Sequence, residues 1–296
     1  MIVSNLDIHT VTNHRCLLGE GVVWDGMGKT VSWIDIERGK IHEYSTIRKS
    51  HRTIKVNQKI GSISYTTKGN YVAAMQNGFG IIYRASGKIK MIANPESDLP
   101  NNRFNDGKCD PAGRFWAGTM SLNEEPNRGS VYVLDKNLSI TKMISGTTIS
   151  NGMAWDINRK KFYFVDTPTF TIASYDCDTN TSQITGKEIA VKIPAKEGSP
   201  DGMTIDKEGM LWVAHWDGWQ VARWNPLNGQ KIGEIRLPVS RVTSCTFGGD
   251  NMDSLYITSA KIGLSKNELG SQPLAGALFV VKNCGYRGLP ISKFTE

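Results

Sequence analysis

Short apolar runs alternate with polar turn clusters along most of this chain, a pattern typical of β-strands joined by hairpins. No long stretch has helical periodicity, and one short helical turn is expected at residues 265–269. Several of the apolar runs belong to a repeated hexapeptide, which reads EGVVWD at 20–25, NGMAWD at 151–156 and DGMTID at 201–206. Each copy opens with an oxygen-bearing side chain and Gly, ends on Asp, and is followed by a second strand-like run.

Looser copies of this unit begin at residues 61, 105 and 243, so it recurs six times at separations of 41 to 50 residues. Strand-rich repeats of this length indicate propeller blades. We therefore predict an all-β fold, a six-bladed β-propeller with four antiparallel strands per blade, as a single domain over residues 1–296. The strand-like segment at 8–12 precedes the first repeat. It is expected to pair with residues 277–281 and close the ring.

The first positions of the repeats should form a ring at one mouth of the central channel. They read Glu20, Gly61, Asn105, Asn151, Asp201 and Thr243. Glu20, Asn151 and Asp201 supply three oxygen ligands and a charge of −2, which suits Ca²⁺, Mg²⁺ or Mn²⁺. Zn²⁺ or Fe²⁺ could also bind in an open site. The alternative is that these are turn residues, since Asp-Gly and Asn-Gly are common turn dipeptides. Their occurrence at the same position of three repeats favours a metal site.

Composition narrows the function class. The chain has 296 residues, 39% of them apolar and 21% charged, and a net charge of +7 with scattered Lys and Arg. The basic cluster at 48–52 is interpreted as a solvated loop, so no nucleic-acid partner is predicted. Neither a signal peptide nor an apolar run near the ~20 residues that span a bilayer is present, so no membrane partner is predicted either. Five Cys without a CxxC motif indicate reduced thiols. We expect a cytoplasmic protein that is a monomer or weak oligomer.

Motifs of other enzyme classes are missing: the chain has no GxSxG, HExxH, GxGxxG or P-loop. Of the five His, only His215 lies in a repeat, and we interpret it as bonding a neighbouring strand rather than reaching the channel. Trp116, Trp155, Trp212 and Trp216 are expected to pack between blades. A Trp near the mouth that stacks on a sugar ring is the alternative.

Longer motifs resemble one known family. They are LGEG at 18–21, NRFNDGK at 102–108, AGTM at 117–120, SNGMAW at 150–155 and PDGM at 200–203. In this order they resemble the regucalcin (senescence marker protein)/gluconolactonase family, and QPLAGALF at 272–279 resembles its bacterial sugar-lactonase members. The resemblance extends from about residue 15 to residue 290.

This resemblance implies a six-bladed propeller that holds one divalent metal ion (Ca, Zn, Mn, Mg or Fe). Its metal ligands match Glu20, Asn151 and Asp201, and its substrate-binding residues match Arg103 and Asn105. A third substrate position, often Glu in the animal proteins, matches Asn123, which leaves the sugar preference open. The family's general acid/base matches Asp201, so that residue is assigned two roles.

We therefore expect metal-dependent hydrolysis of a sugar lactone, such as glucono-, galactono-, arabinono- or xylonolactone, to the aldonic acid. One alternative is a calcium-binding regulatory protein of the regucalcin type, although three oxygen ligands are few for a high-affinity calcium site. Another is a related propeller esterase or phosphotriesterase. A propeller that only mediates interactions would have a structurally filled channel, which the polar ring contradicts.

Overall fold

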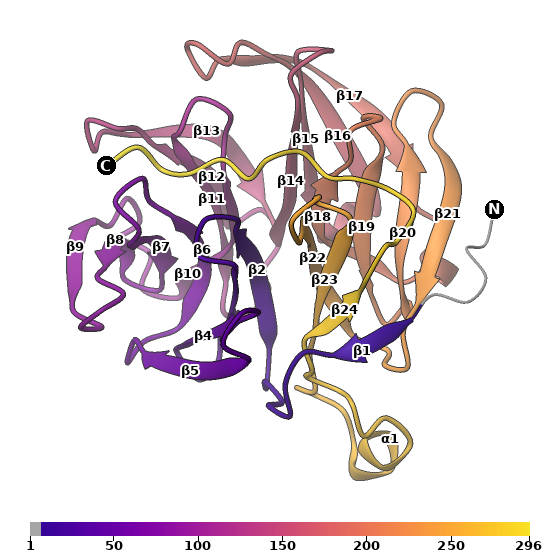
Figure 1. Ribbon diagram of the computed structural model, residues 1–296. Helices are drawn as coiled ribbons and strands as arrows, with labels where there is room; N and C mark the ends of the chain where they lie inside the picture. Colours follow the sequence, from indigo (N-terminus) through magenta and orange to yellow (C-terminus); the bar gives the residue numbers. More distant parts are fainter. Residues whose placement is uncertain (1–6) are drawn as a thin grey trace.

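Six four-stranded antiparallel sheets surround a central axis in the computed structural model, which describes residues 7–296 (Figure 1). The first three sheets, from the innermost strand outward, are β2 (Gly19–Asp25), β3 (Thr30–Asp35), β4 (Lys40–Ser45), β5 (Ser50–Lys55); β6 (Ile60–Tyr65), β7 (Tyr71–Met75), β8 (Gly78–Ile82), β9 (Ile89–Ala93); and β10 (Asn102–Cys109), β11 (Phe115–Ser121), β12 (Gly129–Leu134), β13 (Ile140–Thr147). The next two are β14 (Ser150–Asp156), β15 (Lys161–Asp166), β16 (Thr171–Cys177), β17 (Ile184–Lys192); and β18 (Ser199–Ile205), β19 (Leu211–Trp216), β20 (Gln220–Asn225), β21 (Gln230–Arg236). This confirms the predicted six-bladed propeller.

The sixth blade contains both ends of the ring. Its strands are β22 (Val242–Gly248), β23 (Ser254–Ser259), β24 (Phe279–Val281) and β1 (Ile8–Thr10). Strand β1 pairs antiparallel with β24, with Ile8 opposite Val281 and Thr10 opposite Phe279. The predicted closure by the N-terminal strand is therefore confirmed.

Helical structure is sparse and lies in connections. Among the residues that the structure describes, it consists of α1 (Lys266–Ser271), η1 (Thr167–Thr169) and η2 (Ala195–Glu197). The Ser265 side chain caps α1 by accepting a hydrogen bond from the Glu268 N–H, in a capping box. Within residues 7–296, none of the helices has the length and apolar character that crossing a lipid bilayer requires.

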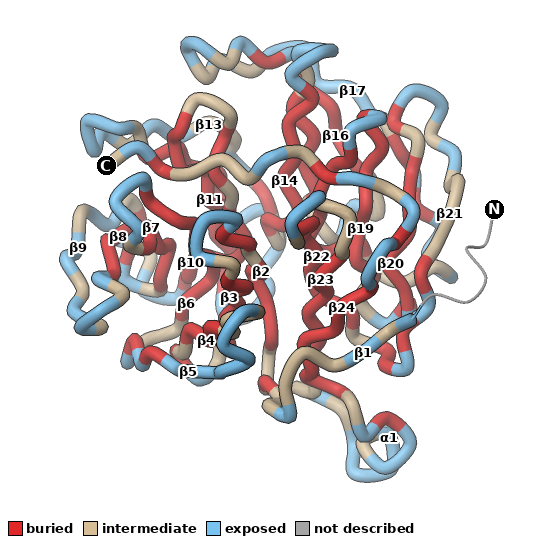
Figure 2. Tube along the Cα trace, in the orientation of Figure 1, coloured by how far each residue is buried: buried red, intermediate tan, exposed pale blue. Residues whose placement is uncertain are grey.

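The core lies between neighbouring blades, and Figure 2 shows the inner strands buried while outer strands such as β5 and β9 are more exposed. The ring centroid of Trp116 in the third blade lies 5.6 Å from Trp155 and 5.0 Å from Phe162 in the fourth. Trp212 in the fifth blade contacts Phe247 in the sixth, at 5.7 Å. These three Trp pack between blades, as expected.

Every innermost strand changes register near its start, at the same mouth of the channel. Such a β-bulge sets two residues of one strand against one of its partner and turns a side chain out of the ladder. Asn105, Asn151 and Asp201 lie inside these bulges, and Glu20 is the last paired residue before one. At Gly61 a side chain would collide with backbone carbonyls of the next blade, so this position must stay empty.

At the opposite mouth, the hairpin turns between the first two strands of four blades begin with the Asp that ends the repeated hexapeptide, namely Asp25, Asp110, Asp156 and Asp206. Asp206 illustrates their role, because its carboxylate accepts hydrogen bonds from the N–H groups of Glu208 and Met210 and from Trp212 Nε1, at 2.9–3.0 Å. The C-terminal tail crosses these turns, coloured yellow in Figure 1. Its backbone bonds to the turns of three blades: Lys207 N–H to Arg287 O, Phe294 N–H to Tyr65 O and Thr295 N–H to Gly113 O.

Removal of residues 1–10 should lower the free energy of unfolding by ~2–4 kcal/mol, because the backbone bonds of β1 and the packing of Ile8 are lost. Denaturant unfolding of the truncated chain measures this loss. A chain that carries a Gly/Ser segment of equal length in place of residues 1–10 is the control for chain length, and it should be destabilised equally. Full stability in either variant would show that β1 does not hold the ring closed.

Candidate functional site

The bulged ends of the inner strands surround a pocket of about 590 Å³ at the uncovered mouth. Five of the six side chains expected to form the site line it: Glu20, Arg103, Asn105, Asn151 and Asp201. All five are buried to more than 90%, although each carries a polar or charged group. They come from four blades, so the pocket exists only once the ring has closed.

The Asn151 amide is held in a fixed orientation. Its Nδ2 donates a 3.0 Å hydrogen bond to the hydroxyl of Thr167, which in turn donates to the carbonyl oxygen of Pro200 at 2.9 Å. The other end of the amide, Oδ1, is buried without a hydrogen-bond partner in the structure. A buried carbonyl oxygen without a partner is costly, and such atoms commonly face a ligand or ion.

Two carboxyl groups, those of Glu20 and Asp201, line the same pocket as this amide and are near enough for their charges to interact. Burial raises the pKa of Glu20 well above its ordinary value, and the nearby charges of Asp201 and Asp106 raise it further. Burial followed by the charge of Asp106 does the same to the pKa of Asp201. The pair is therefore costly to ionise in the absence of a cation.

A divalent cation fits this group of side chains. Glu20 and Asp201 would supply two negative charges and Asn151 a neutral oxygen, which are the hard ligands that Ca²⁺, Mg²⁺ and Mn²⁺ prefer. The cation would satisfy the unpartnered Oδ1 and remove the repulsion between the carboxylates. Three protein ligands leave coordination positions for water or substrate.

Arg103 and Asn105 form a second, hydrogen-bonded unit in the pocket. Arg103 Nη1 donates to Asn105 Oδ1 at 2.7 Å and to the carbonyl oxygen of Phe104 at 2.9 Å. Asn105 Nδ2 donates to the carbonyl oxygen of Ser150 in the next blade, at 2.9 Å. The guanidinium is thus positioned by the backbone of two blades. Because both bonds use Nη1, the Nη2 and Nε atoms of the guanidinium can donate hydrogen bonds to a ligand.

Asp106 is a site residue that the sequence reasoning missed. It shares the bulge of Asn105 and accepts a 2.7 Å hydrogen bond from the N–H of Gly107. Burial raises its pKa, while the Lys108 ammonium lowers it. The motif that drew attention to Asn105 contains Asp106 as well, but only the effect of its charge on the pKa of Glu20 and of Asp201 shows that it lies near the pair.

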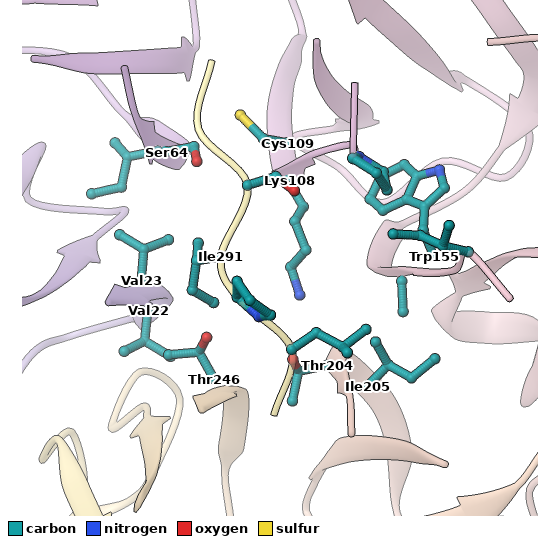
Figure 3. A pocket seen from close by; sticks show the side chains of 17 residues that line it. Val22, Val23, Ser64, Lys108, Cys109, Trp155, Thr204, Ile205, Thr246 and Ile291 are labelled. Atoms are coloured by element: carbon teal, nitrogen blue, oxygen red, sulfur yellow. The ribbon is translucent and has the colours of Figure 1, made fainter. Parts of the chain in front are cut away.

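Lys108 lines a second chamber, of about 300 Å³, beneath the C-terminal tail. Its Nζ donates to the carbonyl oxygen of Met203, and burial lowers its pKa. Figure 3 shows Lys108 extending into this chamber among Val22, Thr204 and Ile291. The chamber walls are mainly apolar, so the polar chemistry is confined to the uncovered side.

Asn123 lies in the exposed turn after β11, and its N–H donates a 3.2 Å bond to the Ser121 hydroxyl. Its neighbours Leu122 and Glu124 line the pocket, whereas Asn123 itself is outside the lining. Its substrate role stays a prediction. Glu124 supplies a carboxylate at this edge, and its position next to Asn123 is the only feature of the sequence that points to it.

The rim of the pocket carries further charged and aromatic groups. Lys59 pairs with Glu37 on one side. On another side the Arg241 guanidinium lies 4.8 Å from the ring centroid of Trp216. Trp216 therefore lies at the mouth, unlike the three packed Trp, and the packing expectation was wrong for this residue.

His215 does not reach the pocket. It is fully buried, with Nδ1 3.0 Å from the carbonyl oxygen of Glu197 and Nε2 accepting from Trp224 Nε1 at 3.3 Å. Burial lowers its pKa to about 4. This confirms the interpretation of His215 as a residue that joins neighbouring segments.

Comparison with known proteins places these features in a family. Residues 18–261 match the SMP-30/Gluconolactonase/LRE-like region. Regucalcin of Gallus gallus is 35% identical over 293 residues, which cover 97% of this chain and 98% of that protein. Among solved structures, a luciferin-regenerating enzyme has a TM-score of 0.92 at 28% identity, with 99% of this chain and 100% of the other covered. A calcium-binding protein, regucalcin, from Agrobacterium tumefaciens has a TM-score of 0.92 at 26% identity, with 98% of each chain covered.

The carboxyl pair generates a prediction about stability and pH. In protein treated with a chelator, the double variant Glu20→Gln, Asp201→Asn should gain at least ~1 kcal/mol of stability at pH 7, the free energy of one pKa unit. Folding raises both pKa values, so the stability that protonation contributes is lost as the pH rises above ~4, where the unfolded carboxyl groups ionise. The advantage of the variant should therefore appear between pH ~4 and pH 7.

Denaturant unfolding across this pH range, with chelator present, measures the effect. The double variant Asp176→Asn, Glu188→Gln alters two exposed carboxylates and serves as the control. Equal stability of the Glu20, Asp201 variant and the unmodified chain at every pH would contradict the raised pKa values.

Proposed function

The chain belongs to the SMP-30/gluconolactonase/LRE-like family, and we propose that it hydrolyses a sugar lactone to the open aldonic acid with the help of one divalent cation. One observation carries the proposal. Two buried carboxyl groups of raised pKa and an unpartnered amide oxygen face the same pocket as a buried guanidinium. Metal-assisted ester hydrolysis needs these groups: ligands for a cation, a base for water and a donor for developing negative charge.

The proposed substrate is neutral and rich in hydroxyl groups. The pocket volume of about 590 Å³ lies in the range of small-molecule sites. Arg103 and Asn105 would bind the lactone carbonyl and a ring hydroxyl, while Glu124 would accept from another hydroxyl at the edge. Trp216 offers an aromatic face to the sugar ring.

In the proposed reaction, Asp201 accepts a proton from water as the water oxygen attacks the lactone carbonyl carbon. The ring C–O bond then breaks, and the same carboxyl group returns the proton to the leaving ring oxygen. A bound cation would supply Lewis acidity at the carbonyl and increase the acidity of water. Arg103, fixed by Asn105 and the Phe104 carbonyl, donates to the oxygen that gains negative charge. Glu20 would remain ionised and balance the charge of a bound cation.

A second candidate function rests on the regucalcin relatives, one of which is described as a calcium-binding protein. Calcium regulation would use the same three oxygen ligands without hydrolysis. The two candidates differ in one respect: only the lactonase requires the Arg103 and Asn105 unit beside the metal ligands. A related propeller esterase would use the same groups on a different ester. The cytoplasmic location and the monomeric or weakly oligomeric state likewise stay predictions.

A panel of aldonolactones tests the proposal directly. Chelator-treated protein should lose hydrolysis of the preferred lactone, and addition of single divalent metals, Ca²⁺ and Zn²⁺ among them, should restore it to different extents. Acid release measured at constant pH reports the rate. Equal hydrolysis before and after chelation would exclude a role for the metal, and failure on every lactone together with calcium binding would favour the regulatory alternative.

Asp201→Asn should lower kcat for the preferred lactone at least ~10²-fold, because general base catalysis commonly contributes that much or more. The exposed substitution Asp176→Asn should leave kcat unchanged. Metal content is measured on the same samples, since Asp201 is also a predicted ligand. A variant that retains the wild-type kcat would remove Asp201 from the mechanism.

A further inference from the structure

A second cluster of ligand-type side chains lies outside the channel, at the junction between the N-terminal segment and the first blade. It consists of His14 and Cys16 after β1, Asp35 at the end of β3, and His42 in β4. Each offers one ligand atom, and these atoms all lie within 4.8 Å of one another. We propose that this cluster binds one zinc-class transition-metal ion through His14, Cys16 and His42, with Asp35 at the fourth position.

Unpartnered nitrogen atoms provide the first support. Nε2 of His14 and Nε2 of His42 are both buried without a hydrogen-bond partner in the structure, and the His42 side chain is entirely inaccessible to solvent. Leaving a buried imidazole nitrogen without a partner costs free energy, because it loses its bond to water and gains nothing in exchange. A bound cation removes this cost for both rings at once.

His42 is also oriented as metal-binding imidazoles are. Its Nδ1 lies 3.0 Å from the Thr53 hydroxyl and 3.1 Å from His51 Nε2, and its ring stacks on Trp33 at 5.2 Å between centroids. With the proton on Nδ1 donated to one of these acceptors, the lone pair of Nε2 is free to bind metal. Such a hydrogen bond behind the ligand fixes the tautomer and the plane of the ring.

The chemistry of the four groups selects the metal. Two imidazole nitrogens, one sulfur and one carboxylate oxygen favour Zn²⁺, Co²⁺ or Ni²⁺ over Ca²⁺ and Mg²⁺. Burial lowers the pKa of His14 and brings that of His42 to about 3, so both rings are neutral, as ligands must be. Burial also raises the pKa of Cys16 to about 12. The cluster is therefore uncharged at sulfur until an ion displaces the thiol proton.

Asp35 supplies the remaining charge. Its carboxylate accepts a 2.8 Å hydrogen bond from the Leu17 N–H, and its bonds from Leu18 and Arg38 are longer, at 3.3–3.4 Å. The long bonds are weak and leave lone pairs available. Thiolate and carboxylate together carry a charge of −2, which matches a divalent ion, while Arg38 stays beside Asp35 as a counter-charge.

Coordination requires a modest contraction. Zinc ligand distances of 2.0–2.3 Å place tetrahedral ligand atoms ~3.4–3.8 Å apart, so the 4.8 Å cluster must close by ~1 Å. His14 is only partly buried and belongs to a connecting segment, so its side chain can make this movement. A groove beside the cluster, lined by Asn13, His14, Tyr44 and His51 among others, gives the ion access from solvent.

The position of the cluster defines what the ion would do. Cys16 N–H donates to the Gly276 carbonyl oxygen at 2.7 Å, and Val11 N–H donates to that of Leu278 at 2.8 Å. The segment that carries His14 and Cys16 is therefore attached to the sixth blade, whereas Asp35 and His42 belong to the first. A bound ion links the last blade to the first, and its role is structural rather than catalytic.

Cobalt(II) distinguishes this site from the channel site, because only a sulfur ligand gives a thiolate-to-cobalt charge-transfer band in the near ultraviolet. The full-length chain is stripped with a chelator and titrated with Co²⁺. We expect the band in the unmodified chain, its saturation with one cobalt equivalent in Glu20→Gln, whose channel site is altered, and its complete loss in Cys16→Ser. Cys177→Ser, at a buried thiol of the fourth blade, and Glu20→Gln, in the channel, should both retain the band.

Thermal unfolding supplies the second measurement. Zinc should raise the unfolding midpoint of the Glu20→Gln variant, and this rise should be absent when Cys16→Ser is added. If Cys16→Ser does not fold, His14→Asn provides the same test, with at least ~10-fold weaker cobalt binding expected. A folded chain without the charge-transfer band, or a band that survives Cys16→Ser, would overturn the proposal. None of these outcomes depends on lactone hydrolysis, so the two proposals fail independently.

Discussion

The register change near the start of every innermost strand is the constraint on which the site depends. A regular antiparallel ladder would direct alternate side chains into the packed layers between blades. The bulge releases Asn105, Asn151 and Asp201 from this alternation and turns them into the channel. Because all six blades change register at the same end, the polar side chains of the site gather at one mouth of the channel. The hairpin turns lie at the other mouth.

Packing between the blades of the closed ring offsets the free energy that burial of the site's carboxyl groups costs. Glu20, Asp106 and Asp201 are buried near one another, and burial raises the pKa of each. Such a group is unfavourable in isolation and persists because blade-to-blade packing over-determines the positions of its strands. A bound cation would offset the repulsion between these carboxylates, so the features that cost stability in its absence are those that would let the site bind an ion.

The fold and most of the pocket could be predicted from the sequence because both follow from the repeat. The spacing between repeats indicated six blades, and the shared first position of Glu20, Asn151 and Asp201 indicated that they lie at one mouth of the channel. What it could not predict depends on contacts outside the repeat. Glu124 and Trp216 reach the rim through the conformations of individual turns. His14 and His42 are brought together by the junction of the N-terminal segment with the first blade, a long-range contact that no local pattern encodes.

The position of the C-terminal tail affects how ligands enter and leave the channel. It lies across one end of the channel with backbone bonds to the turns of several blades, whereas the pocket that contains Glu20, Asn151 and Asp201 opens at the other end. Anything bound deep in the pocket leaves only after whatever lies above it. Under the proposed chemistry, the acid formed in one turnover must depart before the next lactone enters, and product and substrate therefore compete for one passage.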